Sequence, residues 1–354
     1  MSNQDNGYEV VIKKKSAVPE SQYQDTSVSN MPIASLISEA ETYLYYIHDE
    51  KDTSYEVLLN ELVNKVCSAT ALSGNANDFH NLAVQLARKN EYLFACKILE
   101  CGLKHFPRET DLLADYLAYG VSAIEKKENE DIIKNNCRNY FQELNSIPRA
   151  IWSWRAYSFM IDYMLSLLNK ECLSDEAVKS RKQEMLALAQ EYRVAFPYDE
   201  DGYFSEAEIY RHFHDHENET RILEEATKNL KLCPKCALRC GDIYVERGEY
   251  QKAMNKIKRC VQDTNQTQSN INEGYMFYIF ALCKIAILQK KKKDDIYDEK
   301  TIQDIYSDFN IALKRFGDNH NDYKSVIREK TTALRDKSGI DIQENCDKLY
   351  ELIA

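Results

Sequence analysis

The sequence predicts an all-α protein built from repeated pairs of antiparallel helices, and three observations carry this prediction. The 354 residues include only 10 Gly and 6 Pro, a low content that favours long helices over many-turned sheets. Apolar residues recur at intervals of three and four along most of the chain, as they do on the buried face of a helix. One spacing of aromatic, small and large apolar residues occurs twice, at 79–107 and at 237–257.

The chain before the first of these units divides into two parts. Residues 1–31 are polar and lack periodicity, so we expect a disordered tail. Its Lys13–Lys15 run is interpreted as solvated, with docking to an acidic surface as the alternative. Residues 32–75 predict a pair of helices, at 33–47 and at 54–72, and the second ends where Ser73, Gly74 and Asn75 break the pattern.

The unit at 79–107 has the composition of two closely packed helices. Ala83 and Ala95 are small where the helices would cross, so the two axes can approach to about 8–10 Å. The turn is expected at Asn90–Tyr92, and Pro107 comes after the second helix because it cannot continue it. Asn77 or Asp78 is the expected N-cap of the first helix.

Residues 110–200 are helical by periodicity but irregular in length. Helices are expected around 112–121, 132–144, 151–168 and 185–196, with an interruption at Ile147–Pro148. The segment 151–168 is apolar nearly all round, so we expect it to be buried on several sides.

The helix-pair spacing returns in the second half of the chain. The unit at 237–257 carries Gly241, Tyr244 and Ala253 at the diagnostic positions, and a looser copy at 204–234 precedes it. Further helices are expected at 275–288, 304–315, 321–334 and 342–353, the last as a cap. The predicted organisation is a tail at 1–31, a helical pair at 32–75, repeats with an irregular middle at 76–267, and C-terminal repeats with a cap at 268–354.

These two units resemble the tetratricopeptide repeat (TPR) family, whose pattern is aromatic-x2-Leu-Gly/Ala-x2-large, then Ala-x3-large and Pro. The resemblance is carried by Phe79, Leu82–Ala83, Leu86, Ala95, Leu99 and Pro107, and by Ala237, Cys240–Gly241, Tyr244, Ala253 and Ile257. It implies a right-handed α-solenoid that binds peptides or partner helices on the concave face of its first helices. Helix phase then projects the partner-binding residues Asn77, His80, Asn81, Val84, Arg88, Lys235, Arg239, Asp242 and Glu246. The repeated Lys and Asn carboxylate clamp of chaperone-binding members is missing at these positions.

Two clusters resemble metal or catalytic sites. Cys233, Cys236 and Cys240 have no second C-x2-C pair to complete a zinc site, so we interpret them as core, with zinc as the alternative. His212, His214 and His216 fall at a helix end and turn, about 20 Å from those cysteines across a helix of about 15 residues, and are interpreted as exposed loop residues.

Other motifs add no chemistry. Trp152–Arg155 is weakly similar to the W-x-x-R of prenyltransferase alpha subunits, and its aromatics are interpreted as core. No phosphate loop, dinucleotide fingerprint or hydrolase motif occurs in the sequence. We therefore expect no catalytic residue, metal or cofactor.

Composition limits the partners and the compartment. The net charge of −11 argues against nucleic acid, which needs a basic face. Eleven scattered cysteines in a long chain are not a disulfide framework. The polar N-terminus, and an apolar run at 275–288 too short for a bilayer, lead us to expect a cytoplasmic protein without a membrane contact.

The predicted function is a non-catalytic adaptor that assembles or regulates a partner protein. A peptide-responsive sensor is the first alternative, and a prenyltransferase-alpha-like enzyme subunit is the second.

Overall fold

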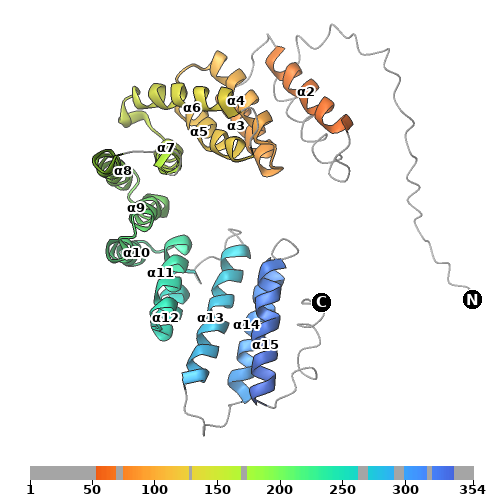
Figure 1. Ribbon diagram of the computed structural model, residues 1–354, viewed down its shortest axis with the longest axis vertical. Helices are drawn as coiled ribbons and strands as arrows, with labels where there is room; N and C mark the ends of the chain where they lie inside the picture. Colours follow the sequence, from red (N-terminus) through yellow and green to blue (C-terminus); the bar gives the residue numbers. More distant parts are fainter. Residues whose placement is uncertain are drawn as a thin grey trace, which may run out of the picture. The chain divides into compact units, whose positions relative to one another are not determined.

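The computed structural model describes residues 53–68, 75–126, 130–168, 174–261, 270–290, 299–316 and 321–338. Throughout these residues the regular elements are helices, as the sequence predicts (Figure 1). The chain forms two compact units, Met1–Arg138 and Asn139–Ala354. The tail at 1–31 and the helices expected at 33–47 and 342–353 lie outside the described residues.

Unit 1 contains α2 (Thr53–Ser68), α3 (Ala76–Arg88), α4 (Tyr92–His105), α5 (Thr110–Glu125) and the first part of α6 (Glu130–Asn145). Helices α3 and α4 form the first antiparallel pair. Helix α2 packs against α4, and α5 packs against both α3 and α4. The expected cap is wrong by two or three residues: Asn75 precedes the helix, and its backbone N–H donates to the Asp78 carboxylate at 2.9 Å. The Asp78 side chain thus helps to cap the helix from a position within its first turn.

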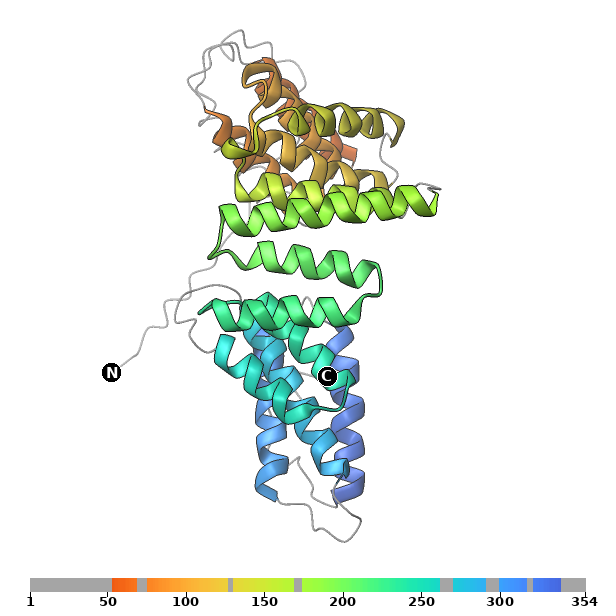
Figure 2. The ribbon, with the colours of Figure 1, turned by 90° about the vertical axis from the view of Figure 1, so that its left-hand side faces the viewer.

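Unit 2 continues with the rest of α6, the short 3-10 helix η2 (Arg149–Ile151), α7 (Trp154–Leu168) and α8 (Asp175–Ala195). Then follow the pairs α9 (Glu200–His212) with α10 (His216–Asn229), and α11 (Pro234–Glu246) with α12 (Tyr250–Val261). Helices α13 (Asn270–Lys290), α14 (Glu299–Phe316) and α15 (Asn321–Ser338) complete it. Figure 2 shows α7 to α10 as successive neighbours, each packed on the next.

The turn inside a helix pair has the same geometry in three places. Asn90, His214 and Gly248 each have a positive φ, of 65°, 56° and 74°. The next residue donates its N–H to the carbonyl five residues earlier, as in Glu249 to Tyr244 at 2.8 Å. This is the Schellman arrangement, which satisfies carbonyls at the end of a helix. The turn expected at 90–92 is thereby confirmed.

Small residues lie where the paired helices cross, as predicted. Ala83, Ala95 and Ala253 are fully buried. A Cβ on Gly241 would lie 2.2 Å from Cδ1 of Ile257 on α12, so a larger residue there would force the Ile257 side chain to move. Tyr244 is also fully buried, and its hydroxyl reaches Glu224 on α10.

The irregular middle is fully buried on one side and half-buried over most of the rest, since only Trp154 and Asp162 of α7 are exposed. Helix α7 begins at Trp154 and buries one side, through Ala156, Tyr157, Met160, Ile161, Tyr163 and Met164. Trp152 is in the core at 4% exposure, but Trp154 is 38% exposed. Only one of the two tryptophans is therefore a core aromatic. Trp154 instead has the guanidinium of Arg155 5.1 Å from its ring centroid.

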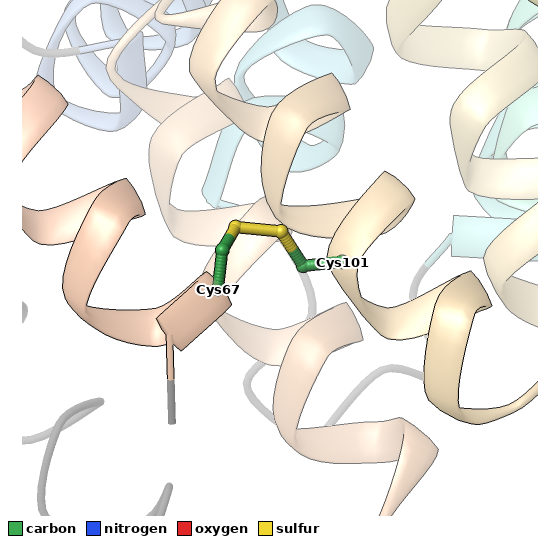
Figure 3. Close-up of a disulfide and its surroundings, with 2 residues drawn as sticks. All are labelled: Cys67 and Cys101. Atoms are coloured by element: carbon green, nitrogen blue, oxygen red, sulfur yellow. A yellow bond between two sulfur atoms is a disulfide. The ribbon is translucent and has the colours of Figure 1, made fainter. Parts of the chain in front are cut away.

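A disulfide joins Cys67 at the end of α2 to Cys101 on α4 (Figure 3). A single bridge is not a disulfide framework, but the sequence did not predict this pair: packing of α2 on α4 brings two residues 34 positions apart to a Cα–Cα distance of 5.4 Å. Cys96, Cys137, Cys233, Cys236, Cys240 and Cys283 are free and buried. Spacing alone does not reveal such a pair, since only the folded helices define which cysteines face each other.

None of the helices in the described ranges combines the length and the apolar character needed to span a bilayer.

Candidate functional site

Helices α7, α9 and α11 bury matching positions, which places them in one register. The buried Ala156, Tyr157, Met160, Ile161, Tyr163 and Met164 of α7 align with residues 46 positions later in α9. The buried set of α11 follows 34 positions after that of α9. Helix α9 contacts both α7 and α11. The three are therefore the equivalent first helices of successive pairs.

The same register defines a second side of each of these helices, whose residues are exposed or half-buried except for Ser205. We call it the first-helix face: Arg155, Phe159, Asp162 and Ser166 of α7, Asp201, Ser205, Glu208 and His212 of α9, and Lys235, Arg239, Asp242 and Glu246 of α11. The four residues predicted in α11 fall on it at equivalent positions. The face carries five carboxylates and three cations.

Both predicted cations of α11 are paired within the chain. Lys235 Nζ lies 2.5 Å from the Asp201 carboxylate on α9. Arg239 Nε donates at 2.8 Å to the fully buried Glu219 of α10. These side chains crosslink neighbouring pairs, so a partner would have to compete with an internal carboxylate to bind them.

Asp162, Glu208 and Asp242 occupy the same position on α7, α9 and α11. Asp162 and Asp242 are exposed and have no hydrogen-bond or ion-pair partner among the residues described, whereas Glu208 binds Arg211 one turn along its own helix. Sequence reasoning found Asp242 alone. A step of 34 residues back from Asp242 leads to Glu208 and could have been found from the sequence. The step of 46 residues from Glu208 back to Asp162 could be recognised only from the buried positions of α7.

The surroundings of these carboxyls oppose ionisation. Although Asp162 is accessible to solvent, its pKa is raised to about 6, chiefly because nearby protein atoms displace water and also because of the charges of Glu208 and Asp201. Loss of hydration also raises the pKa of Glu208 and of Asp242. Because Glu208 and Asp201 on α9 and Lys235 on α11 all act on Asp162, the three helices share one electrostatic environment. A bound cation would relieve the repulsion between the carboxylates.

Glu200 lies at the edge of this face and supports α11. One carboxylate oxygen accepts the backbone N–H of Lys235 at 3.0 Å and that of Cys236 at 3.4 Å. It therefore caps the first turn of a neighbouring helix. Burial raises the pKa of Glu200 to about 7, while these amide bonds and Lys235 oppose the increase.

The predicted residues in unit 1 divide into two kinds. Asn77, Asn81 and Arg88 are exposed along one side of α3 and Val84 is half-buried. His80 is not on that exposed side: it is buried, and its Nδ1 bonds to the fully buried Asp115 of α5. Its neighbour Phe79 packs in the seam between the helices of the pair. His80 instead faces α5, and its bond to Asp115 joins the first helices of two successive pairs.

The cysteine and histidine clusters lie apart, as expected. Cys233, Cys236 and Cys240 are fully buried in the core, and burial raises the pKa of Cys236 well above its usual value, which keeps its thiol protonated. The three histidines fall at the end of α9, in the turn and at the start of α10. In the described ranges no group of His, Cys, Asp and Glu has the arrangement of a metal site.

The paired helices, their recurrent turns and their small crossing residues together define the architecture. The fold is TPR-like. No protein-family model matches the sequence, and no curated protein does. A solved structure that resembles it is a thermophilic TPR protein from Thermus thermophilus, with 13% sequence identity and a TM-score of 0.42 over 60% of this chain and 100% of that one. The description as TPR-like is based on the helix pairs of this chain.

Proposed function

We propose that the chain is a non-catalytic adaptor that binds a segment of a partner protein on the first-helix face of unit 2. The observation that carries the proposal is the repeated carboxylate at Asp162, Glu208 and Asp242, since two of these three have no hydrogen-bond or ion-pair partner among the described residues. The partner segment that best complements the face is extended and carries Lys or Arg.

The helix spacing suggests a sequence period for that segment. Packed helix axes lie about 8–10 Å apart, and an extended chain advances about 3.3 Å per residue. A peptide that crosses α7, α9 and α11 would therefore meet one carboxylate about every third residue. Arg239 remains attached to Glu219 in this arrangement and borders the bound segment.

A binding measurement with two peptides tests the proposal. The first peptide has 12 residues with Lys at every third position and Ala elsewhere, and the second has the same composition with its lysines contiguous. Fluorescence anisotropy of the labelled peptides should show tighter binding of the spaced peptide to the full chain. The triple variant Asp162→Asn, Glu208→Gln, Asp242→Asn should weaken this binding by about tenfold, because each exposed charge pair contributes up to about 1 kcal/mol.

A matched variant separates position from overall charge. Glu176→Gln, Glu217→Gln and Glu249→Gln remove three exposed carboxylates from α8, α10 and the turn before α12. This control should bind the spaced peptide as the natural chain does. Equal losses in both triple variants would mean that peptides respond to net charge alone, and the proposed site would be wrong.

The compartment is a separate part of the proposal. Six free buried cysteines in the described residues favour the reducing cytoplasm, whereas the Cys67–Cys101 disulfide favours an oxidising compartment. We retain the cytoplasm because a single bridge does not make a disulfide framework. Peptide mapping of protein alkylated at the moment of lysis would test it, with a fully oxidised Cys67–Cys101 pair as the contrary result.

A further inference from the structure

A small pocket lies between η2, α7 and α8 in unit 2, away from the first-helix face. The buried side chains of Met160, Met164 and Leu188 line it, Ala187 lies at its exposed rim, and Arg149 forms part of its wall. The carboxylates of Glu184 and Glu191 also border it. It therefore combines an apolar floor with a polar rim.

Arg149 is held in place by its neighbours but keeps one unused donor. Its Nη2 donates to Asn145 Oδ1 at 2.7 Å, its guanidinium carbon lies 3.7 Å from the ring centroid of Trp152, and its Nε is 3.6 Å from the Glu191 carboxylate. Its Nη1 is buried and has no hydrogen-bond partner among the described residues. A buried donor without an acceptor is unfavourable, so an incoming acceptor would gain from meeting it.

The volume of the pocket limits what can enter. The space is about 150 Å³, whereas sites for drug-sized molecules occupy roughly 300–1,000 Å³. An apolar cavity of roughly this size can hold one benzene molecule. The fit is therefore to a single side chain, and the two methionines on the floor can adapt to its shape.

We propose that this pocket takes one leucine-sized apolar side chain of a partner protein, while an adjacent main-chain carbonyl accepts a hydrogen bond from Arg149 Nη1. Glu184 and Glu191 disfavour a carboxylate at the same place, so a main-chain amide of a continuous segment is the occupant and a free C-terminus is not. A buried apolar anchor of this kind supplies much of the energy of a protein interface. The site goes beyond the proposed basic segment, since its ligand needs no charge.

The test uses the full chain with 13C-methyl-labelled methionines, and the Met160 and Met164 signals are assigned with Met→Leu variants. The probes are N-acetyl-leucine N-methylamide and N-acetyl-alanine N-methylamide. The leucine probe should shift both methyl signals in a saturable way at millimolar concentration. The alanine probe should bind at least tenfold more weakly, because it lacks about three buried carbon groups.

Substitutions on α8 provide a matched pair, because Ala187 at the rim and Ala177 away from the pocket are both exposed. Ala187→Leu should fill the entrance and weaken the leucine probe about tenfold, whereas Ala177→Leu should leave it unchanged. Arg149→Lys, which keeps the charge but removes Nη1, should weaken the leucine probe severalfold and leave benzene binding unchanged.

Several results would overturn this inference. They are shifts that do not saturate, equal shifts with the alanine probe, or equal binding in the Ala187→Leu and Ala177→Leu variants. Loss of benzene together with the leucine probe in Arg149→Lys would refute the hydrogen bond. Because the probes are uncharged and the signals come from Met160 and Met164, a failure here is distinct from a failure of the basic peptide to bind the first-helix face.

Discussion

Two carboxyl groups of unit 2 hold their protons at a pH where most carboxyls are ionised. Asp162 and Glu200 have pKa values raised to about 6 and about 7, chiefly through loss of hydration. Asp162 belongs to the first-helix face, and Glu200 lies at its edge. Protonation of Asp162 would remove one negative charge from the first-helix face, so binding of a basic segment should weaken as the pH falls below about 6.

Stability should follow the opposite trend with pH. A carboxyl with a raised pKa keeps its proton in the folded state after the unfolded chain has lost it, so the contribution of Glu200 to the free energy of unfolding falls as the pH rises from about 4 to about 7. Glu200→Gln should remove about 1 kcal/mol of this fall, a figure reduced for the partial exposure of the side chain. Urea unfolding between pH 4.5 and 7.5 measures it, with the exposed Glu217→Gln as control. A Glu200→Gln curve parallel to that of the natural chain would contradict the assignment.

His214 occupies a left-handed backbone conformation that suits glycine better. Its φ is 56°, and the equivalent turn of the next pair uses Gly248 at 74°. A side chain in this conformation costs about 1 kcal/mol, so His214→Gly should stabilise unit 2 and Gly248→Ala should destabilise it by a similar amount. Thermal unfolding of both variants checks this. Asn90→Gly, at the same position of the first pair, should gain less because asparagine tolerates this conformation.

At the scale of the element, the approach of α11 to α12 depends on the missing Cβ of Gly241. An added Cβ would lie 2.2 Å from Cδ1 and 2.7 Å from Cγ1 of Ile257. Gly241→Ala should therefore destabilise the pair by about 1–3 kcal/mol, as overpacking does. Ile257→Val in the same chain removes the closer atom and should recover part of the loss, a coupling that a double-mutant cycle by urea unfolding would reveal. Strictly additive effects would refute the contact.

The disulfide governs how firmly α2 is attached to α4. It closes a loop with a sequence separation of 34 residues, which in the chain-entropy model is worth about 3–4 kcal/mol. Reduction should lower the thermal unfolding temperature of the natural chain. Cys67→Ala, at the half-buried end of the bridge, should lower it by a similar amount and abolish any further response to reductant. A natural chain whose unfolding ignores reductant would show that the bridge is absent in solution.

At the scale of the whole molecule, electrostatic interactions act over the longest distances. The chain carries a net charge of −11, and the first-helix face is one place where carboxylates recur in register. Binding of the lysine peptide should therefore weaken as salt rises from 50 to 500 mM, because the Debye length falls from about 14 to about 4 Å over that range. Anisotropy titrations measure this. The uncharged leucine probe should show no such loss, which separates electrostatic attraction from apolar anchoring.

The sequence by itself determined the helical class, the paired helices and most of their turns. Periodicity places the core residues of α3 and α11, and the small residues at Ala83, Ala95 and Gly241 mark where helices cross. Such features are local, since a helix of 3.6 residues per turn sets which residues share a side. For that reason four predicted residues of α11 fall on one face, although the sequence could not show that Lys235 and Arg239 would be paired internally.

Only the tertiary structure decided which distant residues meet. The bond between His80 and Asp115, the Cys67–Cys101 disulfide and the pocket beside Arg149 each join residues from different helices. Their positions depend on helix lengths, on the 46-residue step between α7 and α9, and on how far each helix slides along its neighbour. Side-chain packing sets these quantities across the whole interface, so no local pattern of residues encodes them.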